Sequence, residues 1–183
     1  MLAKLIAMFA ATLILTVPVG SQQPCSRGLT NAPALFGFRL GMSFDDVRSI
    51  LGPTIKFWKK PPKNGEGIFF QNFVEEPPTN TLSGVRALYL RFFNNKLYQV
   101  EIFYEDKDRP TKLSDFTNRL SSQLDLPTDS WSIKNGQAAI NCGDFMLTAD
   151  TILNRHVELT DDAADQAFKK ERQKQKKPSK KKN

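Results

Sequence analysis

Apolar positions recur at helical spacing in two short segments of the chain. In residues 43–53 they fall three and four apart, and Ser43 followed by Asp46 predicts a helix start with a capping box. In residues 111–124 they are spaced by three, four and four, and a proline soon stops the segment. The apolar stripes are Phe44, Val47, Ile50 and Leu51 in the first and Leu113, Phe116, Leu120 and Leu124 in the second. We expect two short amphipathic helices that pack on a sheet.

Residues 85–104 alternate with the period of a β-strand on both sides of Asn94-Asn95. The apolar residues expected on one face are Leu88, Leu90 and Phe92 before the turn and Tyr98, Val100, Ile102 and Tyr104 after it. Asparagine tolerates the positive φ that a tight turn needs. The pattern predicts an antiparallel hairpin, with Arg91, Gln99 and Glu101 on a face that meets water.

Shorter apolar runs predict further strands, and prolines and glycines predict the connections between them. Strands are expected within 35–42, 68–74, 138–149 and 155–160, with a bulge or bend at Gly143-Asp144 in the third run. Residues 56–67 and 75–84 are expected to be loops. A last helix should start at Asp161 or Asp162 and run past Phe168 into a lysine-rich end.

These elements indicate an α+β fold, in which an antiparallel β-sheet of about four to six strands carries two short helices packed on one face. We divide the chain into a signal peptide (1–21), an N-terminal segment (22–34), an α+β domain (35–163) and a Lys-rich tail (164–183) that is helical or disordered. A chain of 183 residues with 40% hydrophobic and 25% charged residues fits one globular domain.

The first 21 residues have the pattern of a secretory signal peptide. Lys4 precedes an apolar run from Leu5 to Val19, and small residues follow it, so we place cleavage after Ser21. An uncleaved anchor helix is the alternative, because the run is near the lower length limit for a membrane span. Cleavage would leave no transmembrane span and a periplasmic or secreted protein.

Export changes the interpretation of the two cysteines, because an oxidising compartment permits disulfides. Cys25 and Cys142 are expected to form one bridge between the start of the mature chain and a late strand, with two free thiols as the alternative. The two cysteines and the single His156 are too few for a zinc finger or an iron–sulfur cluster, so no metal and no cofactor is expected.

The net charge of +7 is concentrated at the C-terminus. Residues 164–183 hold nine of the 26 basic residues and two of the 19 acidic ones, so the rest of the chain balances at 17 of each. The basic residues are Lys169, Lys170, Arg172, Lys174, Lys176, Lys177, Lys180, Lys181 and Lys182, and they are candidates for binding a polyanion or anionic lipid. A solvated appendage without a partner is the alternative.

Gly41-Met42-Ser43, Val47 and Leu51-Gly52 resemble the G-M-[ST]-x3-V-x3-L-G signature of two bacterial groups. These are the small outer-membrane lipoprotein of the β-barrel assembly machinery and the β-lactamase-inhibitor-protein-like modules. Residues 92–97, followed by Val100 and Ile102, are similar to the hairpin motif of the same groups. The resemblance implies a helix packed on an antiparallel sheet and a non-catalytic, protein-binding envelope module.

Catalytic signatures are weak. The adjacent carboxylates at 45–46, 75–76 and 161–162 do not provide two carboxyls at a fixed separation, and the first and third pairs suit helix starts. His156 is expected to point away from the apolar face with Glu158 and Thr160, as a surface histidine. There is no G-x-S-x-G elbow and no Gly-rich nucleotide loop. We expect that the protein is not an enzyme.

The loop at residues 56–67 is stiffened by prolines and contains an aromatic pair beside lysines. This combination gives contact area at low ordering cost. Its candidate partner-binding residues are Phe57, Trp58, Lys59, Lys60 and Lys63, and the alternative is that both rings are buried under the loop. The leading hypothesis is an exported envelope protein whose domain binds another protein while the tail tethers it to anionic surfaces. A polyanion-binding protein and a small secreted hydrolase are the alternatives, and no nucleic acid is expected because the protein is exported.

Overall fold

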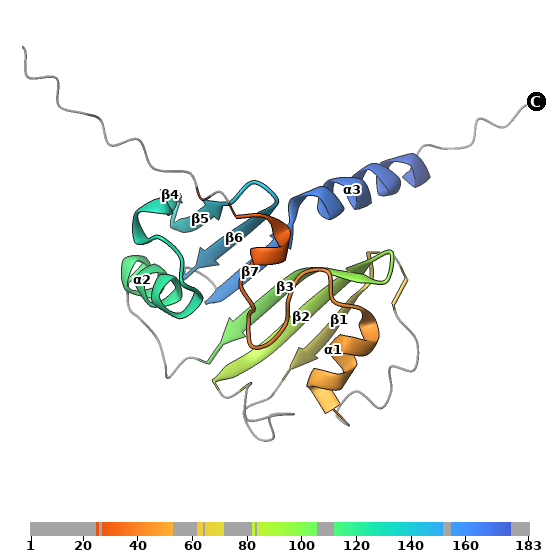
Figure 1. Cartoon of the computed structure of the whole chain (residues 1–183), viewed down its shortest axis with the longest axis horizontal. Coiled ribbons are helices and arrows are strands. Elements are labelled where there is room, and N and C mark those ends of the chain that lie inside the picture. The colour runs from red at the N-terminus through yellow and green to blue at the C-terminus, as the bar shows by residue number, and fades with distance from the viewer. Residues whose placement is uncertain are drawn as a thin grey trace, which may run out of the picture.

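The computed structural model describes residues 25, 27–52, 62–63, 65–71, 82, 84–105, 112–151 and 155–176 (Figure 1). The signal segment, most of the 56–67 loop and residues 177–183 lie outside this range. The helices are α1 (Phe44–Leu51), α2 (Leu113–Leu124) and α3 (Asp162–Lys176), with short 3-10 turns at Leu29–Asn31 and Thr128–Ser130. The strands are β1 (Gly67–Gln71), β2 (Val85–Phe93), β3 (Lys96–Tyr104), β4 (Ser132–Lys134), β5 (Gln137–Asn141), β6 (Phe145–Asp150) and β7 (His156–Asp161). None of the described helices is both long and apolar enough to span a membrane.

The strands form one antiparallel sheet in the order β1-β2-β3-β7-β6-β5-β4, which confirms the predicted α+β class. The sheet has seven strands, so the expected four to six is too few. Two causes account for the difference. Strand β4 has only three residues and no apolar alternation, and the run at 138–149 is two strands, β5 and β6, with Gly143 (φ 87°) in the turn between them.

The sheet has a repeated plan on either side of its centre. A helix followed by the meander β1-β2-β3 makes one half, and a helix followed by the meander β5-β6-β7 makes most of the other. The halves join where β3 pairs with β7, from Gln99 opposite Thr160 to Phe103 opposite His156. This seam is the only place where strands distant in sequence pair within the described sheet.

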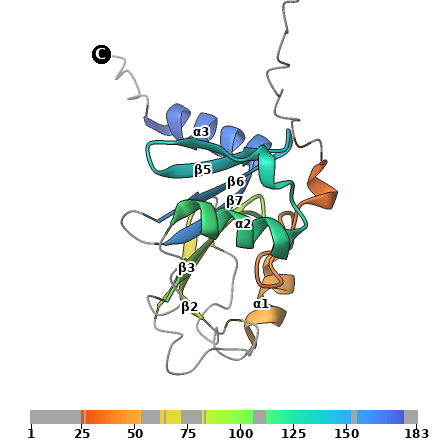
Figure 2. The ribbon, with the colours of Figure 1, turned by 90° about the vertical axis from the view of Figure 1, so that its left-hand side faces the viewer.

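The hydrophobic core lies between helices α1 and α2 and the face of the sheet that they cover (Figures 1 and 2). Phe44 of α1 meets Phe92 of β2 with ring centroids 5.8 Å apart, and Phe116 of α2 meets Tyr104 of β3 at 5.4 Å. Burial raises the pKa of the Tyr104 hydroxyl to about 12. Both predicted apolar stripes therefore face the sheet.

The ends of the helices follow from local sequence. The Ser43 hydroxyl accepts a bond from the Asp46 amide (3.2 Å), and the Asp46 carboxylate accepts one from the Ser43 amide (2.9 Å). This confirms the predicted capping box. The α3 helix starts in a related way, because the Ala164 amide donates to the Asp161 carboxylate at 2.9 Å.

Two expectations about individual residues are wrong. Residues 35–42 do not form a strand, because Leu35 and Phe38 exchange backbone bonds (3.0 and 2.9 Å) around a tight turn at Phe36 and Gly37, both with positive φ. Tyr98 does not share the core face with Val100. A bulge on β3 places Leu97 opposite Phe92, so Leu97 takes the core position and Tyr98 turns to the other face.

The predicted disulfide between Cys25 and Cys142 is present. It ties the N-terminal segment to the turn between β5 and β6, and both cysteines are buried. Two further contacts hold the same segment, since the Leu29 amide donates to Asp144 (3.1 Å) and Arg27 pairs with Asp125 (3.3 Å). The described part of the N-terminal segment, Cys25 and residues 27–34, thus packs with the folded domain.

Candidate functional site

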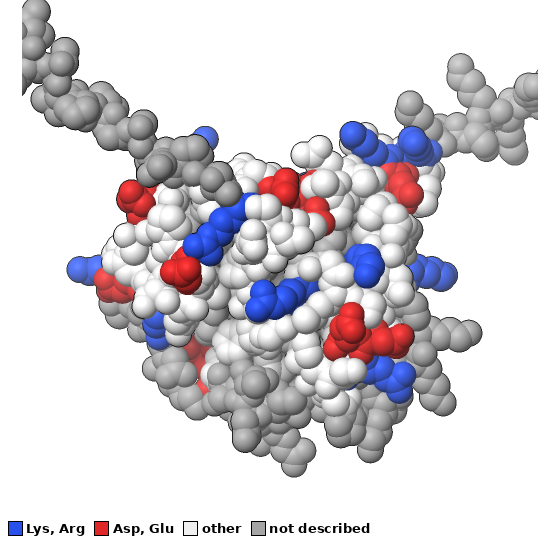
Figure 3. Space-filling view, viewed as in Figure 1, with Lys and Arg blue, Asp and Glu red and all other residues white. Residues whose placement is uncertain are grey.

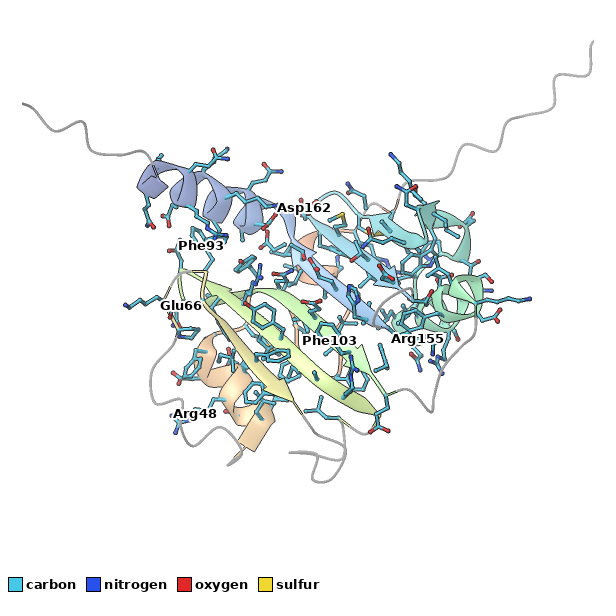
Figure 4. All side chains as sticks on the ribbon, turned by 180° about the vertical axis from the view of Figure 1, so that it is seen from behind. Arg48, Glu66, Phe93, Phe103, Arg155 and Asp162 are labelled. Atoms are coloured by element: carbon cyan, nitrogen blue, oxygen red, sulfur yellow. A yellow bond between two sulfur atoms is a disulfide. The ribbon has the colours of Figure 1, made fainter. Side chains whose placement is uncertain are left out.

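The second face of the sheet is the main candidate for a functional surface, and we call it the open face. In Figure 4 this face is turned towards the viewer, with Phe103 near its centre and α3 over one end. Strand register places side chains on it in rows, because residues paired directly across strands share a face. The central rows are Phe69, Tyr89, Glu101, Glu158 and Thr148; Arg91, Gln99, Thr160 and Met146; and Phe103, His156 and Asp150.

Aromatic and arginine side chains gather on the β1–β2 side of the open face. Phe69 is 49% exposed and meets the Tyr89 ring edge-on at 5.9 Å. The Arg91 guanidinium lies over the same tyrosine, 4.7 Å from the ring centroid. Farther along, the rings of Phe103 and His156 are 5.4 Å apart. The surface therefore offers large, rigid contact groups in fixed positions.

Two carboxylates face each other across the central seam. Glu101 of β3 is directly opposite Glu158 of β7. Burial and the negative charge of Glu158 raise the pKa of Glu101, while His156 and Arg91 oppose that shift. His156 is 3.8 Å from Glu101, and the Thr160 hydroxyl donates to Glu158 at 2.8 Å. His156 lies on the face that the sequence predicted.

Helix α3 covers one end of the open face through a single aromatic residue. The Phe168 ring packs against Tyr98 (5.9 Å) and Phe93 (6.4 Å). Its other neighbour is Gly65, where a Cβ atom would overlap the Phe168 ring. The Gly65 amide is itself bonded to the Phe92 carbonyl at 2.9 Å. Phe93, Tyr98 and Gly65 thus form a socket for Phe168.

Beyond Phe168 the helix leaves the sheet, and its residues 169–175 are all exposed. Lys169 pairs with Asp165 one turn earlier. Figure 3 shows basic side chains with an acidic side chain beside them at the outer part of α3, and both signs of charge also mix over the visible face of the domain. The predicted basic residues Lys169, Lys170, Arg172 and Lys174 are on this projecting part, Lys176 ends the helix, and Lys177, Lys180, Lys181 and Lys182 lie outside the described residues.

A cleft of about 410 Å³ runs between α3 and the β1–β2 end of the open face. One wall comes from the helix and the other from β2 and the turn before β1. The lining residues are Phe168, Glu171, Arg172 and Gln175 on the helix side and Gly65, Glu66, Tyr89 and Arg91 on the sheet side. The helix residues share one face because they are three or four positions apart.

Of the five predicted partner-binding residues, only Lys63 is among the described residues. Phe57, Trp58, Lys59 and Lys60 lie outside the described residues. Lys63 is exposed, and its amide bonds the carboxylate of the cleft residue Glu66 at 3.2 Å. Sequence reasoning missed Arg91 and Phe168 as site residues. The available signal for Phe168 was that it is the one large apolar residue in a lysine-rich helix.

The described residues contain no group of three or more histidine, cysteine or acidic side chains placed to hold a metal ion. Both cysteines are bonded to each other. What the arrangement offers chemically is a surface of aromatic, arginine and carboxylate groups with a cleft at one end. No protein-family model, curated protein or solved structure matches the chain, so its function must be argued from these residues.

Proposed function

We propose that the protein is an exported, non-catalytic envelope protein whose α+β domain binds another protein through the open face. The observation that carries this proposal is the cluster of Phe69, Tyr89 and Arg91 on a sheet face that, among the described elements, only α3 partly covers. Tyrosine, phenylalanine and arginine are enriched at protein interfaces, and tyrosine and arginine are also enriched among the few residues that dominate the binding energy.

Export is supported by two features of the chain. Residues 1–21 have the signal-peptide pattern, and the Cys25–Cys142 bridge is of the kind that persists in oxidising compartments. Both features support a periplasmic or secreted location. The resemblance at residues 41–52 and 92–102 to envelope modules supports the same role.

Site-specific photo-crosslinking in the native host tests the proposal. A photoreactive phenylalanine analogue replaces Phe69 in one version and Arg48, exposed on α1 at the other face, in a control. We expect a discrete protein adduct from position 69 that position 48 does not give. Identical adducts from both positions, or none from position 69, would contradict a partner on the open face.

A second function, tethering to anionic surfaces, is favoured by the projecting part of α3. Its exposed residues 169–175 include four basic residues and one acidic residue, on a chain whose residues 1–163 balance in charge. Each lysine near an anionic membrane contributes about 1 kcal/mol at low salt.

Vesicle co-sedimentation of the full chain tests the tether. The variant replaces the six lysines beyond Arg172 (Lys174, Lys176, Lys177, Lys180, Lys181 and Lys182) by glutamine and keeps Phe168 and the cleft. We expect binding to anionic vesicles that falls steeply with salt and is lost in the variant, while the adduct at position 69 remains. Vesicle binding by the variant equal to that of the natural chain would overturn the tether.

A further inference from the structure

One lining residue of the cleft beneath α3, Arg91, belongs to a cluster of buried polar atoms that lack partners among the described residues. Three side-chain atoms near the β3 bulge are buried without a hydrogen bond to any described residue: Arg91 Nε, Tyr98 Oη and Gln99 Oε1. Tyr98 and Gln99 are only 1% and 7% exposed. Buried polar groups in folded proteins are nearly always paired, so this cluster indicates a missing partner.

Two of the three atoms, Arg91 Nε and Tyr98 Oη, can donate to an acceptor, whereas Gln99 Oε1 itself accepts. Arg91 Nε–H donates only, and the Tyr98 hydroxyl donates most readily to a negatively charged acceptor. Arg91 and Gln99 are directly opposite each other across β2 and β3, so the groups lie side by side. Arg91 has no carboxylate within ion-pair distance among the described residues. The half-buried Arg91 guanidinium has the neutral Tyr89 and Tyr98 side chains as neighbours, and its charge is best balanced by a carboxylate.

The shape and charge of the cleft favour a polypeptide over a small free anion. Its volume of about 410 Å³ is much larger than one carboxylate needs, and the Tyr89 and Phe168 rings provide apolar walls. Glu66 and Glu171 line the same cleft and balance Arg91 and Arg172, so the lining has no net positive charge to hold a free anion. A peptide segment places its acidic side chain at Arg91 and keeps neutral or basic neighbours beside the two glutamates.

We propose that the cleft receives an acidic side chain of the protein partner, whose carboxylate binds Arg91 beside the Tyr98 hydroxyl. This inference rests on the proposed protein-binding function and names the chemistry that the partner must present. It adds a recognition site at the α3 end of the open face. The Phe168 socket positions the helix wall of that site.

Peptide display against the immobilised full chain tests the inference. Random linear peptides are selected, and the best binder is compared with a copy in which its acidic residue is replaced by the amide. We expect selected sequences enriched in aspartate or glutamate at one position, and at least a tenfold loss of affinity for the amide copy. Selected peptides without an acidic preference would overturn the inference.

Protein variants locate the binding. Arg91→Gln should weaken the peptide at least tenfold, whereas Arg48→Gln, the matched arginine on the opposite side, should leave it unchanged. Because Arg91→Gln could disturb the sheet, the natural chain with ¹⁵N-labelled arginine provides an independent readout. The Arg91 Nε–H resonance should shift on adding the peptide but not on adding acetate or phosphate at the same concentration. Equal shifts with the small anions would assign a free-anion site and overturn the peptide.

These experiments distinguish a failure of the cleft inference from a failure of the proposed open-face interface. If the adduct at position 69 persists in Arg91→Gln with unchanged yield, and the selected peptide is insensitive to that variant, the cleft inference fails while the open face remains an interface. If position 69 gives no adduct but an acidic peptide binds at Arg91, the open-face interface fails while a carboxylate site remains.

Discussion

At the residue scale, the central seam of the sheet contains an unfavourable pair. Glu101 and Glu158 are directly opposite each other on a half-buried face, and the arrangement raises the pKa of Glu101. Its folded pKa is above the unfolded value of 4.5, so the folded state binds this proton more tightly. The contribution of Glu101 therefore opposes folding increasingly as pH rises through that value, and it is absent in acid.

Glu101→Gln is expected to stabilise the fold at neutral pH. Like charges opposite each other on strands cost up to about 1 kcal/mol, so the gain in unfolding free energy at about pH 7.5 should be of that order. The gain should vanish at about pH 4, where the natural residue is protonated. Urea unfolding at both pH values measures it, with Glu171→Gln on the exposed part of α3 as control. A gain that persists in acid would show that repulsion is not its source.

A second residue-scale prediction concerns Gly65. An alanine there meets the Phe168 ring and also takes a positive φ (79°). Gly41 has a similar φ (82°) with nothing within 4 Å of a Cβ, so Gly41→Ala isolates the backbone cost of roughly 1–2 kcal/mol. We expect Gly65→Ala to release α3 as well, seen as faster amide exchange across residues 165–170. Equal exchange in the two variants would mean that the socket does not hold the helix.

At the element scale, the structure separates what local sequence determines from what it does not. Helices α1 and α2 and the β2–β3 hairpin were predictable because caps, Asn94-Asn95 and apolar spacing are local signals. Tyr98 was assigned to the wrong face because one bulge residue reverses every side chain beyond it, and nothing in the alternation reveals a bulge. Strand β4 was missed because three exposed residues have no pattern.

The first helix provides an element-scale prediction. Ser43 hydrogen bonds lower the pKa of Asp46, which shows that the capping box favours the charged carboxylate. Ser43→Ala should lower Tm by about 2–4 °C and let the pKa of Asp46 return towards 3.8. Ser49→Ala, on the exposed side of the same helix, should change Tm by less. Calorimetry and carboxyl NMR titration check the two parts, and an unchanged Asp46 titration would contradict the cap.

At the scale of the whole molecule, the candidate site was not predictable because its parts are far apart in the chain. Gly65, Arg91 and Phe168 meet only through the sheet and the docking of α3. The charged C-terminal segment was predictable from composition, because a run of lysines can be identified from the sequence without knowledge of the fold. The disulfide was predictable only because two cysteines allow a single pairing.

The Cys25–Cys142 bridge spans 117 residues and should contribute about 4 to 5 kcal/mol in the chain-entropy model. The double variant Cys25→Ser, Cys142→Ser is expected to lose stability of that order in urea unfolding. The natural chain under reducing conditions should lose a similar amount. A loss below about 1 kcal/mol would contradict the chain-entropy value. It would indicate either that residual structure already restricts the unfolded chain, or that the Arg27 and Leu29 contacts hold the N-terminal segment without the bridge.

The pairing of β3 with β7 also determines the order in which the sheet can be completed. A chain that crosses a membrane from its N-terminus delivers α1 and the β1–β3 meander first, and β3 then waits for β7 until residues 105–155 have followed. Under the proposed export, β3, which is central in the finished sheet, is the bare edge of the part delivered first, and it includes the apolar residues Val100 and Ile102. On the proposed route, the half-delivered chain therefore exposes a strand edge that can aggregate until β7 arrives and covers it.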